Sequence, residues 1–465
     1  MVLCLDNPKH AIYMEKHFRQ FNLISTLKYL LSALLIVIPL YPKFPIFNVP
    51  GTYVAIRAED FLISAIALAW FLLVLRSGFS NFLKGKLNQA ILLYLLAGLL
   101  SCLSSVFLTK TAPTHIVFLH WARRIEYLIP FFAAVEVIKY AKHARFLITS
   151  LFIATFFVFT FGFGQIHFNF PVITTQNEEY SKGLALRWIA GARLSSTFAG
   201  HYDLSAFLVV LLPISTALFW YYKKIKNRIL FLVFSVLPSF WLILRAESRV
   251  SFISFLFGIS VSLWLIKKRI LIIPVLIATI LCGVLFTNLG VRYKNSIKTY
   301  WQKITFVAPA FAQSAALERS RSKQTENEKP QMPSIFEDRS TAIRLNVEWP
   351  RAIRAFMKNP LLGTGYSSIT LATDNDYLRL LGETGILGVS AFFLVILRLL
   401  MKLFGYIKIV RKNWSWYFVC GLAAGFAGLL LNATFIDVFE ASKVAIIFWT
   451  LAGVAIGIVS RDEKA

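Results

Sequence analysis

The chain has 465 residues, of which 57% are hydrophobic and only 15% are charged, and its formal net charge is +26. A soluble protein of this length covers its core with a charged surface, so this composition excludes an ordinary soluble globular protein. Long apolar runs occur along the whole chain, and a run of about 18 or more apolar residues can span a bilayer as a helix. The sequence therefore predicts an all-α polytopic membrane protein.

About twelve apolar segments are predicted to span the membrane. They lie at 23–41, 59–75, 88–107, 118–138, 145–165, 203–222, 229–244, 250–266, 269–288, 385–403, 415–431 and 443–459. The seventh and eighth are short, and a hairpin through "RAESR" joins them. The polar N-terminal residues predict that the first span is an uncleaved anchor. This order predicts an N-terminal membrane region at 1–288, a large outer loop at 289–384 and a C-terminal membrane region at 385–465.

The high positive charge is explained by topology and does not indicate a nucleic-acid partner. Lys and Arg gather in alternate loops, as in "KKIKNR" at 223–228 and "KKR" at 267–269. This alternation is the positive-inside pattern of membrane proteins, and it predicts that both termini are cytoplasmic. The large loop at 289–384 then lies on the outer side of the membrane.

Metal and nucleotide chemistry have no support in the sequence. The four cysteines are scattered without paired spacing, which predicts neither a disulfide framework nor a metal site. The chain lacks GxxxxGK[ST], HExxH and GxSxG motifs. We therefore expect no cofactor.

The large loop changes character along its length. Its middle, "AQSAALERSRSKQTENEKPQMPSIFED", is polar and mixed in charge, so we expect it to be mobile. Residues 344–358 then predict an amphipathic helix, which Pro350 starts or kinks. "NPLLGTG" at 359–365 predicts a turn, and a second short helix is expected to begin near Asp374.

Arginines on the predicted outer side are the first candidate site residues, because guanidinium groups bind phosphate oxygens bidentately and stay charged. A group of them at one membrane surface suits a diphosphate carried by a membrane lipid. The alternative is contact with lipid headgroups or local ion pairing, as with Glu247. The candidates are Arg187, Arg193, Arg245, Arg249, Arg339, Arg344, Arg351 and Arg354.

An acidic cluster supplies the candidate general base. Asp374 or Asp376 could accept a proton from an acceptor hydroxyl. The alternative is helix capping, with Thr373 or Asp374 at the start of a helix. His201 lies at the outer end of the sixth span, where a polar surface role is the alternative to catalysis.

A charged group is also predicted near the outer end of the fourth span. Arg123 and Glu126 can pair at a spacing of three residues, and Arg124 lies beside them. Charges inside a span usually face the protein interior. A structural ion pair and a contact with substrate both remain open for this group.

Three stretches together resemble the O-antigen ligase and polymerase superfamily, also called the Wzy/WaaL family. "ARLSSTFAGHYDLSAFLVVLLP" at 192–213 is similar to its Arg-Leu and Ser-Thr-Phe segment, and "LRAESRVSFISFLFGI" at 244–259 resembles its Ser-Arg hairpin. Residues 344–388 resemble its most specific block, which combines Pro-x-x-Gly-x-Gly, Asn-x-Tyr-Leu and Glu-x-Gly-x-x-Gly. Ligases of the family often have His before the Asn of this block, where this chain has Asp374.

The resemblance implies a bacterial inner-membrane enzyme that transfers a glycan from a polyprenyl-diphosphate carrier to an acceptor hydroxyl, at the periplasmic face and without a metal. It implies partners of four kinds: the lipid-linked glycan donor, a glycan or lipid-linked acceptor, the bilayer, and other membrane proteins of polysaccharide assembly. Asp374 and Arg344 are then the candidate catalytic residues, and Arg193, Arg249 and Arg344 the candidate diphosphate-binding residues. Candidate supporting residues are Arg187, Arg245, Arg351, His201, Asp376 and Glu383.

A transporter of a small anion is the alternative function, and a non-catalytic membrane scaffold is a third. A transporter should place charges at mid-membrane on broken, repeated helices. Here the distinctive charges gather at the predicted outer surface and no inverted repeat is evident, which favours the enzyme.

Overall fold

The computed structural model describes residues 8–49, 55–78, 82–140, 143–172, 186–288, 290, 293, 343–369, 373–410 and 412–463. Helices dominate these residues, which confirms the all-α prediction. The polar middle of the large loop at 312–338 and Arg339 lie outside the described residues. The fold can therefore be followed from the first span to α12 and again from residue 343 onward.

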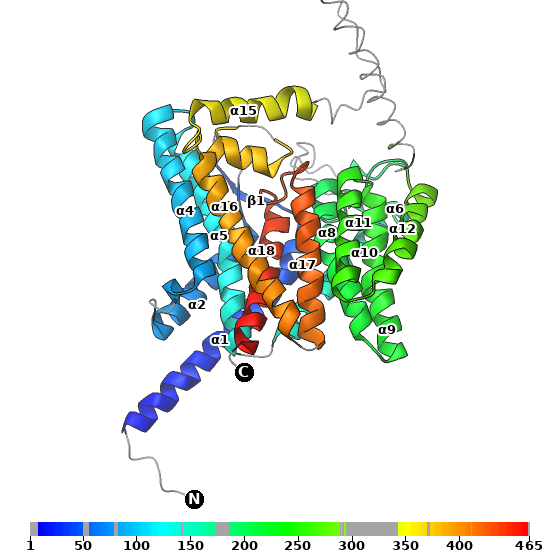
Figure 1. Cartoon of the computed structure of the whole chain (residues 1–465), viewed down its shortest axis with the longest axis horizontal. Helices are drawn as coiled ribbons and strands as arrows, with labels where there is room; N and C mark the ends of the chain where they lie inside the picture. Colours follow the sequence, from blue (N-terminus) through cyan, green and yellow to red (C-terminus); the bar gives the residue numbers. More distant parts are fainter. Residues whose placement is uncertain are drawn as a thin grey trace, which may run out of the picture.

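The first nine predicted spans correspond to helices between residues 8 and 286 (Figure 1). These are α1 Pro8–Leu40, α2 Ala58–Ser77, α4 Lys86–Ser104 continued by η1 Ser105–Thr109, α5 Thr114–Tyr140, α6 Ala144–His167, α8 His201–Tyr221, α9 Ile225–Phe231 continued by η2 Leu232–Val236 and α10 Leu237–Ala246, α11 Arg249–Leu265, and η3 Arg269–Leu271 continued by α12 Ile272–Phe286.

The remaining helices follow the loop. They are η4 Arg344–Glu348 continued by α15 Trp349–Lys358, α16 Asp376–Ile409, α17 Trp414–Asn432 and α18 Ser442–Asp462. Two small antiparallel hairpins are also present, β1 Pro45–Asn48 with β2 Ala55–Arg57, and β3 Pro171–Val172 with β4 Leu186–Arg187.

Ten helices of the described residues are long and apolar enough to cross a membrane, compared with about twelve predicted spans. The other two predicted spans are helical but differ in kind. α11 has 17 residues, and α5 carries five charged residues, including Arg123 and Arg124. The prediction of a short seventh span is wrong, because α9, η2 and α10 form one continuous stretch from Ile225 to Ala246 of 22 residues.

α18 lies at the centre of the bundle. All of its most apolar stretch is buried, and it packs against α5, α8, α16 and α17. Gly453 and Gly457 face α5 so closely that a methyl group at either position would overlap backbone atoms of α5 or the side chain of Ile138. Small residues of this kind let membrane helices approach each other, which places the α5–α18 contact at the core.

At one end of the bundle α15 lies across the helix ends, and the two chain termini lie at the other end (Figure 1). We call the first of these the α15 end. α15 is amphipathic as predicted, with Ala352 buried. The residue types would place Leu345 and Ile353 on the buried face and Arg344 on the exposed face, but Leu345 and Ile353 are exposed while Arg344 is buried. The reason is that Arg344 lies in a π-helical turn and turns inward to a carboxylate.

α16 is two helices joined at Gly385, whose φ of 63° and ψ of −167° are outside the helical region. The turn at 360–365 packs against this break. The backbone N–H groups of Thr364 and Gly365 donate to the carbonyls of Gly382 and Glu383, at 3.0 and 2.8 Å, and Ile386 donates to Pro360 at 2.9 Å. The glycine-rich turn thus satisfies the backbone groups that the break leaves open. The predicted short helix and the tenth span are the two parts of α16.

We expect Gly385→Ala to lower the free energy of unfolding by about 1–3 kcal/mol or more, because this backbone conformation is almost confined to glycine. A methyl group there would also overlap the carbonyl of Leu361. Gly405→Ala in the same helix is the matched control. It has open space around it, so it should be neutral or stabilising by up to about 1 kcal/mol. Unfolding of the two variants in detergent, followed by tryptophan fluorescence, checks this. Equal effects would contradict it.

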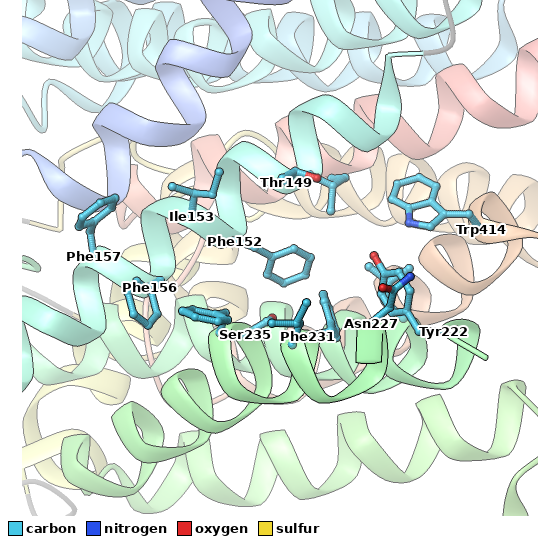
Figure 2. Close-up of a pocket in the computed structure, with 14 residues that line it drawn as sticks. Thr149, Phe152, Ile153, Phe156, Phe157, Tyr222, Asn227, Phe231, Ser235 and Trp414 are labelled. Atoms are coloured by element: carbon cyan, nitrogen blue, oxygen red, sulfur yellow. The ribbon is translucent and has the colours of Figure 1, made fainter. Parts of the chain in front are cut away.

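An apolar groove of about 530 Å³ runs between α6 and the stretch formed by α9 and η2 (Figure 2). Phe152, Phe156 and Phe231 line it, with Tyr222 and Trp414 at one side. Its lining contains no charged side chain. The groove lining therefore offers no carboxylate or guanidinium group to a substrate, and the candidate site is sought at the α15 end.

Candidate functional site

Arg344 and Asp374 form an ion pair at the α15 end. The Arg344 Nη2 and Nε atoms lie 2.7 and 2.9 Å from Asp374 Oδ2. Arg344 is buried, whereas 28% of the Asp374 side chain is exposed. Asp374 has a positive φ of 49°, an uncommon conformation for a residue other than glycine. The two predicted catalytic residues are thus in direct contact, and the carboxylate has the access to solvent.

Tyr202 connects this pair to two further candidate residues, His201 and Arg193. The guanidinium carbon of Arg344 lies 6.0 Å from the centre of the Tyr202 ring, and that ring lies 4.0 Å from the ring of His201. His201 Nε2 is 2.7 Å from Nη1 of Arg193, which is exposed. The first turn of α8 thus lies between Arg193 on one side and the Arg344–Asp374 pair on the other. The continuous row of charged and aromatic residues consists of Arg193, His201, Tyr202, Arg344 and Asp374.

Three other candidate arginines, Arg245, Arg249 and Arg187, are located by the contacts of their backbones. The carbonyl of Arg245 accepts a hydrogen bond from Leu194, which attaches the hairpin at 245–249 to the segment that carries Arg193. Arg249 begins α11, and its carbonyl accepts a hydrogen bond from Tyr293 at 2.7 Å. Arg187 is paired with Pro171 through β3 and β4, and its side chain lies outside the described residues.

Arg351 projects from α15, where its Nη1 atom is buried without a hydrogen-bond partner. The charge of Arg351 favours the ionised form of Glu348, on the preceding turn, and so lowers the pKa of that carboxyl. Arg351 is therefore close to the candidate site but makes no contact with Asp374 that would define a role.

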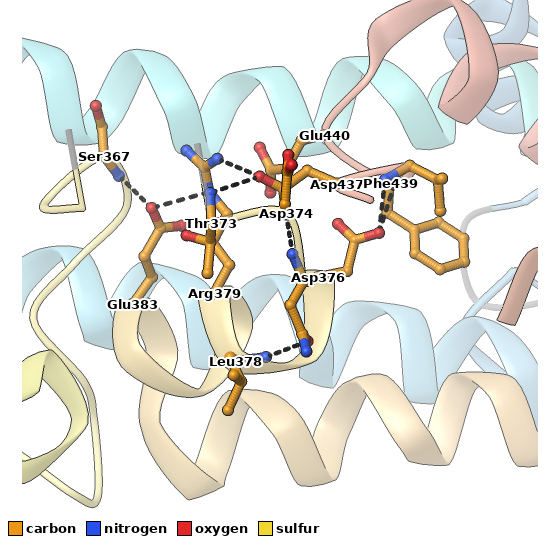
Figure 3. Close-up of polar contacts among 12 residues, drawn as sticks. Ser367, Thr373, Asp374, Asp376, Leu378, Arg379, Glu383, Asp437, Phe439 and Glu440 are labelled. Atoms are coloured by element: carbon orange, nitrogen blue, oxygen red, sulfur yellow. Dashed lines mark hydrogen bonds and ion pairs between the residues drawn. The ribbon is translucent and has the colours of Figure 1, made fainter. Parts of the chain in front are cut away.

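The segment 373–376 is attached to the loop between α17 and α18 by two carboxylates (Figure 3). Asp437 accepts hydrogen bonds from the backbone N–H groups of Thr373 and Asn375, at 3.0 and 2.9 Å. Asp376 is buried and accepts from Val438 and Phe439, at 2.7 and 3.0 Å. These reciprocal bonds fix the backbone on both sides of Asp374.

The predicted helix cap at Thr373 or Asp374 is wrong. Asn375 is the N-cap of α16, and its side chain accepts a hydrogen bond from Leu378 at 3.0 Å. The cap one residue later leaves the Asp374 carboxylate outside the helix, so that it can pair with Arg344. Asp376, a candidate base by sequence, uses its carboxylate for the backbone bonds described above.

Arg379 links the candidate supporting residue Glu383 to Asp437. Its Nε atom lies 3.4 Å from Glu383, and its Nη1 atom lies 3.1 Å from Asp437 (Figure 3). Glu383 is buried and also accepts a hydrogen bond from the Ser367 N–H at 3.1 Å. Arg379 and Asp437 were not predicted from the sequence. A charged residue within an otherwise apolar run is the signal that could have indicated them.

A further ion pair joins α5 to the loop before α18. Arg124 is buried, and its guanidinium group contacts the carboxylate of Glu440 and the carbonyl of Phe439. Burial alone would raise the pKa of Glu440, but the charges of Arg124 and Arg379 outweigh it and lower that pKa. Glu440 is therefore held as a carboxylate, which fixes the loop at 433–441 against the bundle.

Beside these pairs lies a group of charges that connects the β1–β2 hairpin to α5 and α18. The predicted pair is present, with Arg123 3.2 Å from Glu126, and Arg123 also contacts Asp60 at 3.0 Å. Lys443 is fully buried and donates to the carbonyl of Thr197 at 3.0 Å. Arg123 thus pairs with two carboxylates of the protein itself, which supports a structural role for Arg123 and Glu126.

Burial raises the pKa of Asp374 above its ordinary value, and the charge of Arg344 offsets this only in part. Asp374 therefore holds a proton more readily than a carboxylate in water does. A base with such a raised pKa gains driving force for accepting a proton from a hydroxyl group.

Glu348 provides a pH-dependent prediction. Burial, together with Asp374, raises its pKa from 4.5 to about 7, and its Oε2 atom is buried without a hydrogen-bond partner. Because the folded state binds this proton more tightly than the unfolded state, its contribution to stability is complete below pH 4.5 and is lost as the pH rises to 7. We expect Glu348→Gln to raise the melting temperature at pH 8 and leave it nearly unchanged at pH 4.

Melting curves of the wild type and the variant between pH 4 and pH 9 test this. Glu136→Gln is the control, because it removes a carboxylate that is paired with Lys139 near the C-terminal end of α5. Its melting temperature at pH 8 should not rise. An equal gain for Glu348→Gln at both pH values would show that its charge is not the cause.

No group of three or more His, Cys, Asp or Glu side chains within the described residues is placed to hold a metal ion. Cys102, Cys282 and Cys420 are free thiols on three different helices, α4, α12 and α17. The groups that the α15 end offers to a ligand are guanidinium and carboxylate groups, together with backbone amides.

The fold and this site define a multi-pass membrane protein with a row of charged residues at one end of its helix bundle. Residues 234–393 match the family model described as O-Antigen ligase, about a third of the chain, from η2 to the middle of α16 and including Arg249, Arg344 and Asp374. This match supports the predicted resemblance to the O-antigen ligase/polymerase superfamily. No curated protein matches it.

The match and the ten apolar helices indicate a multi-pass bacterial membrane protein with a glycan ligase or polymerase role. The match contains the break in α16 and the turn that packs on it. The local structure around Asp374 therefore lies within the family region and not in a separate extension.

Proposed function

We propose that the protein transfers a glycan from a polyprenyl-diphosphate carrier to an acceptor hydroxyl, and that the α15 end faces the periplasm. The row from Arg193 to Asp374 is the observation that carries this proposal. It combines two arginines, which suit a diphosphate, with one accessible carboxylate, which suits an acceptor hydroxyl.

In this reaction the bond between the anomeric carbon of the glycan and the diphosphate oxygen breaks, and the oxygen keeps the electron pair. The acceptor oxygen forms the new bond to the anomeric carbon, and its proton passes to Asp374. Arg344 and Arg193 stabilise the negative charge that develops on the leaving diphosphate. Arg249 is a third candidate for this role, since its hairpin is attached to the segment that carries Arg193.

The Arg344–Asp374 pair has a further consequence for this mechanism. In the protein without substrate the two groups neutralise each other at 2.7 Å. A diphosphate that binds Arg344 competes with Asp374 for the guanidinium group. Substrate binding then releases the carboxylate, so that the base becomes available only when the donor is in place.

A second apolar groove supports the position of the donor. It has a volume of about 640 Å³ and is lined by phenylalanines of α6, together with Leu40, Pro42 and Thr197. Thr197 is four residues from Arg193 and from His201. An isoprenoid tail in this groove would place the diphosphate near Arg193.

The test is transfer by purified protein in lipid vesicles, supplied with polyprenyl-diphosphate-linked glycan and either a second lipid-linked glycan or a lipid A-core acceptor. Longer glycans with the first acceptor indicate a polymerase, and attachment to the second indicates a ligase. Release of free polyprenyl diphosphate should accompany either product. Uptake of a small anion by the same vesicles without any transfer would overturn the proposal and favour a transporter.

A further inference from the structure

A groove of about 410 Å³ lies at the end of the bundle opposite the candidate site, where α4 begins and α16 and α18 end. Its lining combines apolar and charged side chains. The residues are Lys86, Leu87, Arg398, Met401, Lys402, Gly405, Tyr406, Ile409, Val410, Asp462 and Glu463. This composition differs from that of the apolar grooves along α6.

The groove is lined by three cationic side chains and two carboxylates, and one of the carboxylates is already engaged by neighbouring residues. Arg461 donates to Asp462 at 2.8 and 2.9 Å, and Tyr406 donates to it at 2.7 Å, so the Asp462 carboxylate is satisfied. Within the described residues no carboxylate pairs with Arg398 or Lys402. These two lie one helical turn apart on α16 and face the same groove. Glu463, the other carboxylate of the lining, is exposed to solvent.

The apolar part of the groove faces outward from the bundle. Met401 is 56% exposed and Ile409 is 85% exposed, and both lie on α16, a helix that can span the membrane. Gly405 has no atom within 4 Å of the position a Cβ would take, which leaves the floor of the groove open. The groove therefore offers an apolar surface to acyl chains and cations to a phosphate, at the level where the helices leave the membrane.

We infer that this groove binds the headgroup of an anionic phospholipid, with the phosphate between Lys86, Arg398 and Lys402 and the acyl chains along Met401 and Ile409. The uncapped N-terminus of α4, which begins at Lys86, adds a partial positive charge on the same side. The site is separate from the proposed glycan transfer, so either can fail without the other.

The experiment measures lipid binding to the purified full chain by native mass spectrometry and by the shift in melting temperature. Phosphatidylglycerol, phosphatidylcholine with the same chains, and inorganic phosphate are the three probes. Phosphatidylglycerol should bind at least about tenfold more tightly than phosphatidylcholine and should raise the melting temperature. Equal binding of both lipids would overturn the inference, and equal stabilisation by inorganic phosphate would show a soluble-anion site.

Two variants locate the binding. Arg398→Gln combined with Lys402→Gln should weaken phosphatidylglycerol binding by about tenfold or more, whereas Lys84→Gln combined with Lys408→Gln, at the same end but outside the groove, should not. Gly405→Leu fills the groove without removing a charge, and it should weaken binding as well. Unchanged phosphatidylglycerol binding in the first double variant or in Gly405→Leu would overturn the location.

Discussion

Replacing Arg344 with alanine is expected to reduce glycan transfer about 100- to 1,000-fold, which is the usual effect of removing one donor that stabilises developing charge. Arg344 is buried beside Asp374, so its guanidinium group is already oriented before substrate arrives. Arg344→Lys keeps the charge but loses the two-pronged contact, and it should retain only a small part of the activity. The measurement is the initial rate of transfer in vesicles.

Arg354→Ala is the control for this experiment, because Arg354 is on the same helix, is exposed and lies outside the row of charged residues. Its rate should stay within about twofold of the wild type. Melting curves of all variants separate loss of chemistry from loss of folding. If Arg344→Ala were folded and transferred glycan at more than a third of the wild-type rate, the proposed role of Arg344 would be wrong.

Replacing Asp437 with alanine is expected to lower the free energy of unfolding by about 3 kcal/mol, because the change leaves the largely buried Arg379 with Glu383 as its one remaining ion-pair partner among the described residues. It also leaves the N–H groups of Thr373 and Asn375 without their acceptor. Asp437→Asn keeps one acceptor oxygen and should cost less. Unfolding in detergent with increasing denaturant gives these values.

Transfer should fall with Asp437→Ala even in the fraction that remains folded, because the backbone beside Asp374 is no longer fixed. Glu136→Ala, which breaks a partly exposed pair with Lys139 at a spacing of three residues on α5, should cost less than about 1 kcal/mol and leave transfer unchanged. A loss of stability in Asp437→Ala no greater than in Glu136→Ala would refute the interpretation that this carboxylate holds the site together.

Much of the fold could be predicted because the signals are local. Apolar runs of sufficient length gave the helices, and the turn at 359–365 and the helix beginning near Asp374 followed from glycines and capping residues. The roles of Arg344 and Asp374 were proposed from residue type and from a family resemblance. Their contact, 30 residues apart, could not be predicted from spacing, because it depends on how the turn packs against the break at Gly385.

The buried ion pairs were missed for the same physical reason. Arg124 and Glu440 are 316 residues apart, and Arg379 and Asp437 are 58 apart. Each is a single charge within or beside an apolar run, so nothing in the local pattern names its partner. A long sequence separation also explains why Asp376 could not be told apart from Asp374 as a candidate base. The carboxylate of Asp376 accepts hydrogen bonds from backbone N–H groups 62 and 63 residues later in the chain.

The central position of α18 has a consequence for biogenesis. The helices that surround it, α5, α8, α16 and α17, all precede it in the chain and leave the ribosome earlier. Until α18 enters the bilayer, Arg124 lacks Glu440, and the inward faces of these helices have only lipid or the insertion machinery as neighbours. Assembly of the bundle must therefore wait for α18, and newly made chains depend on remaining insertion-competent during that delay.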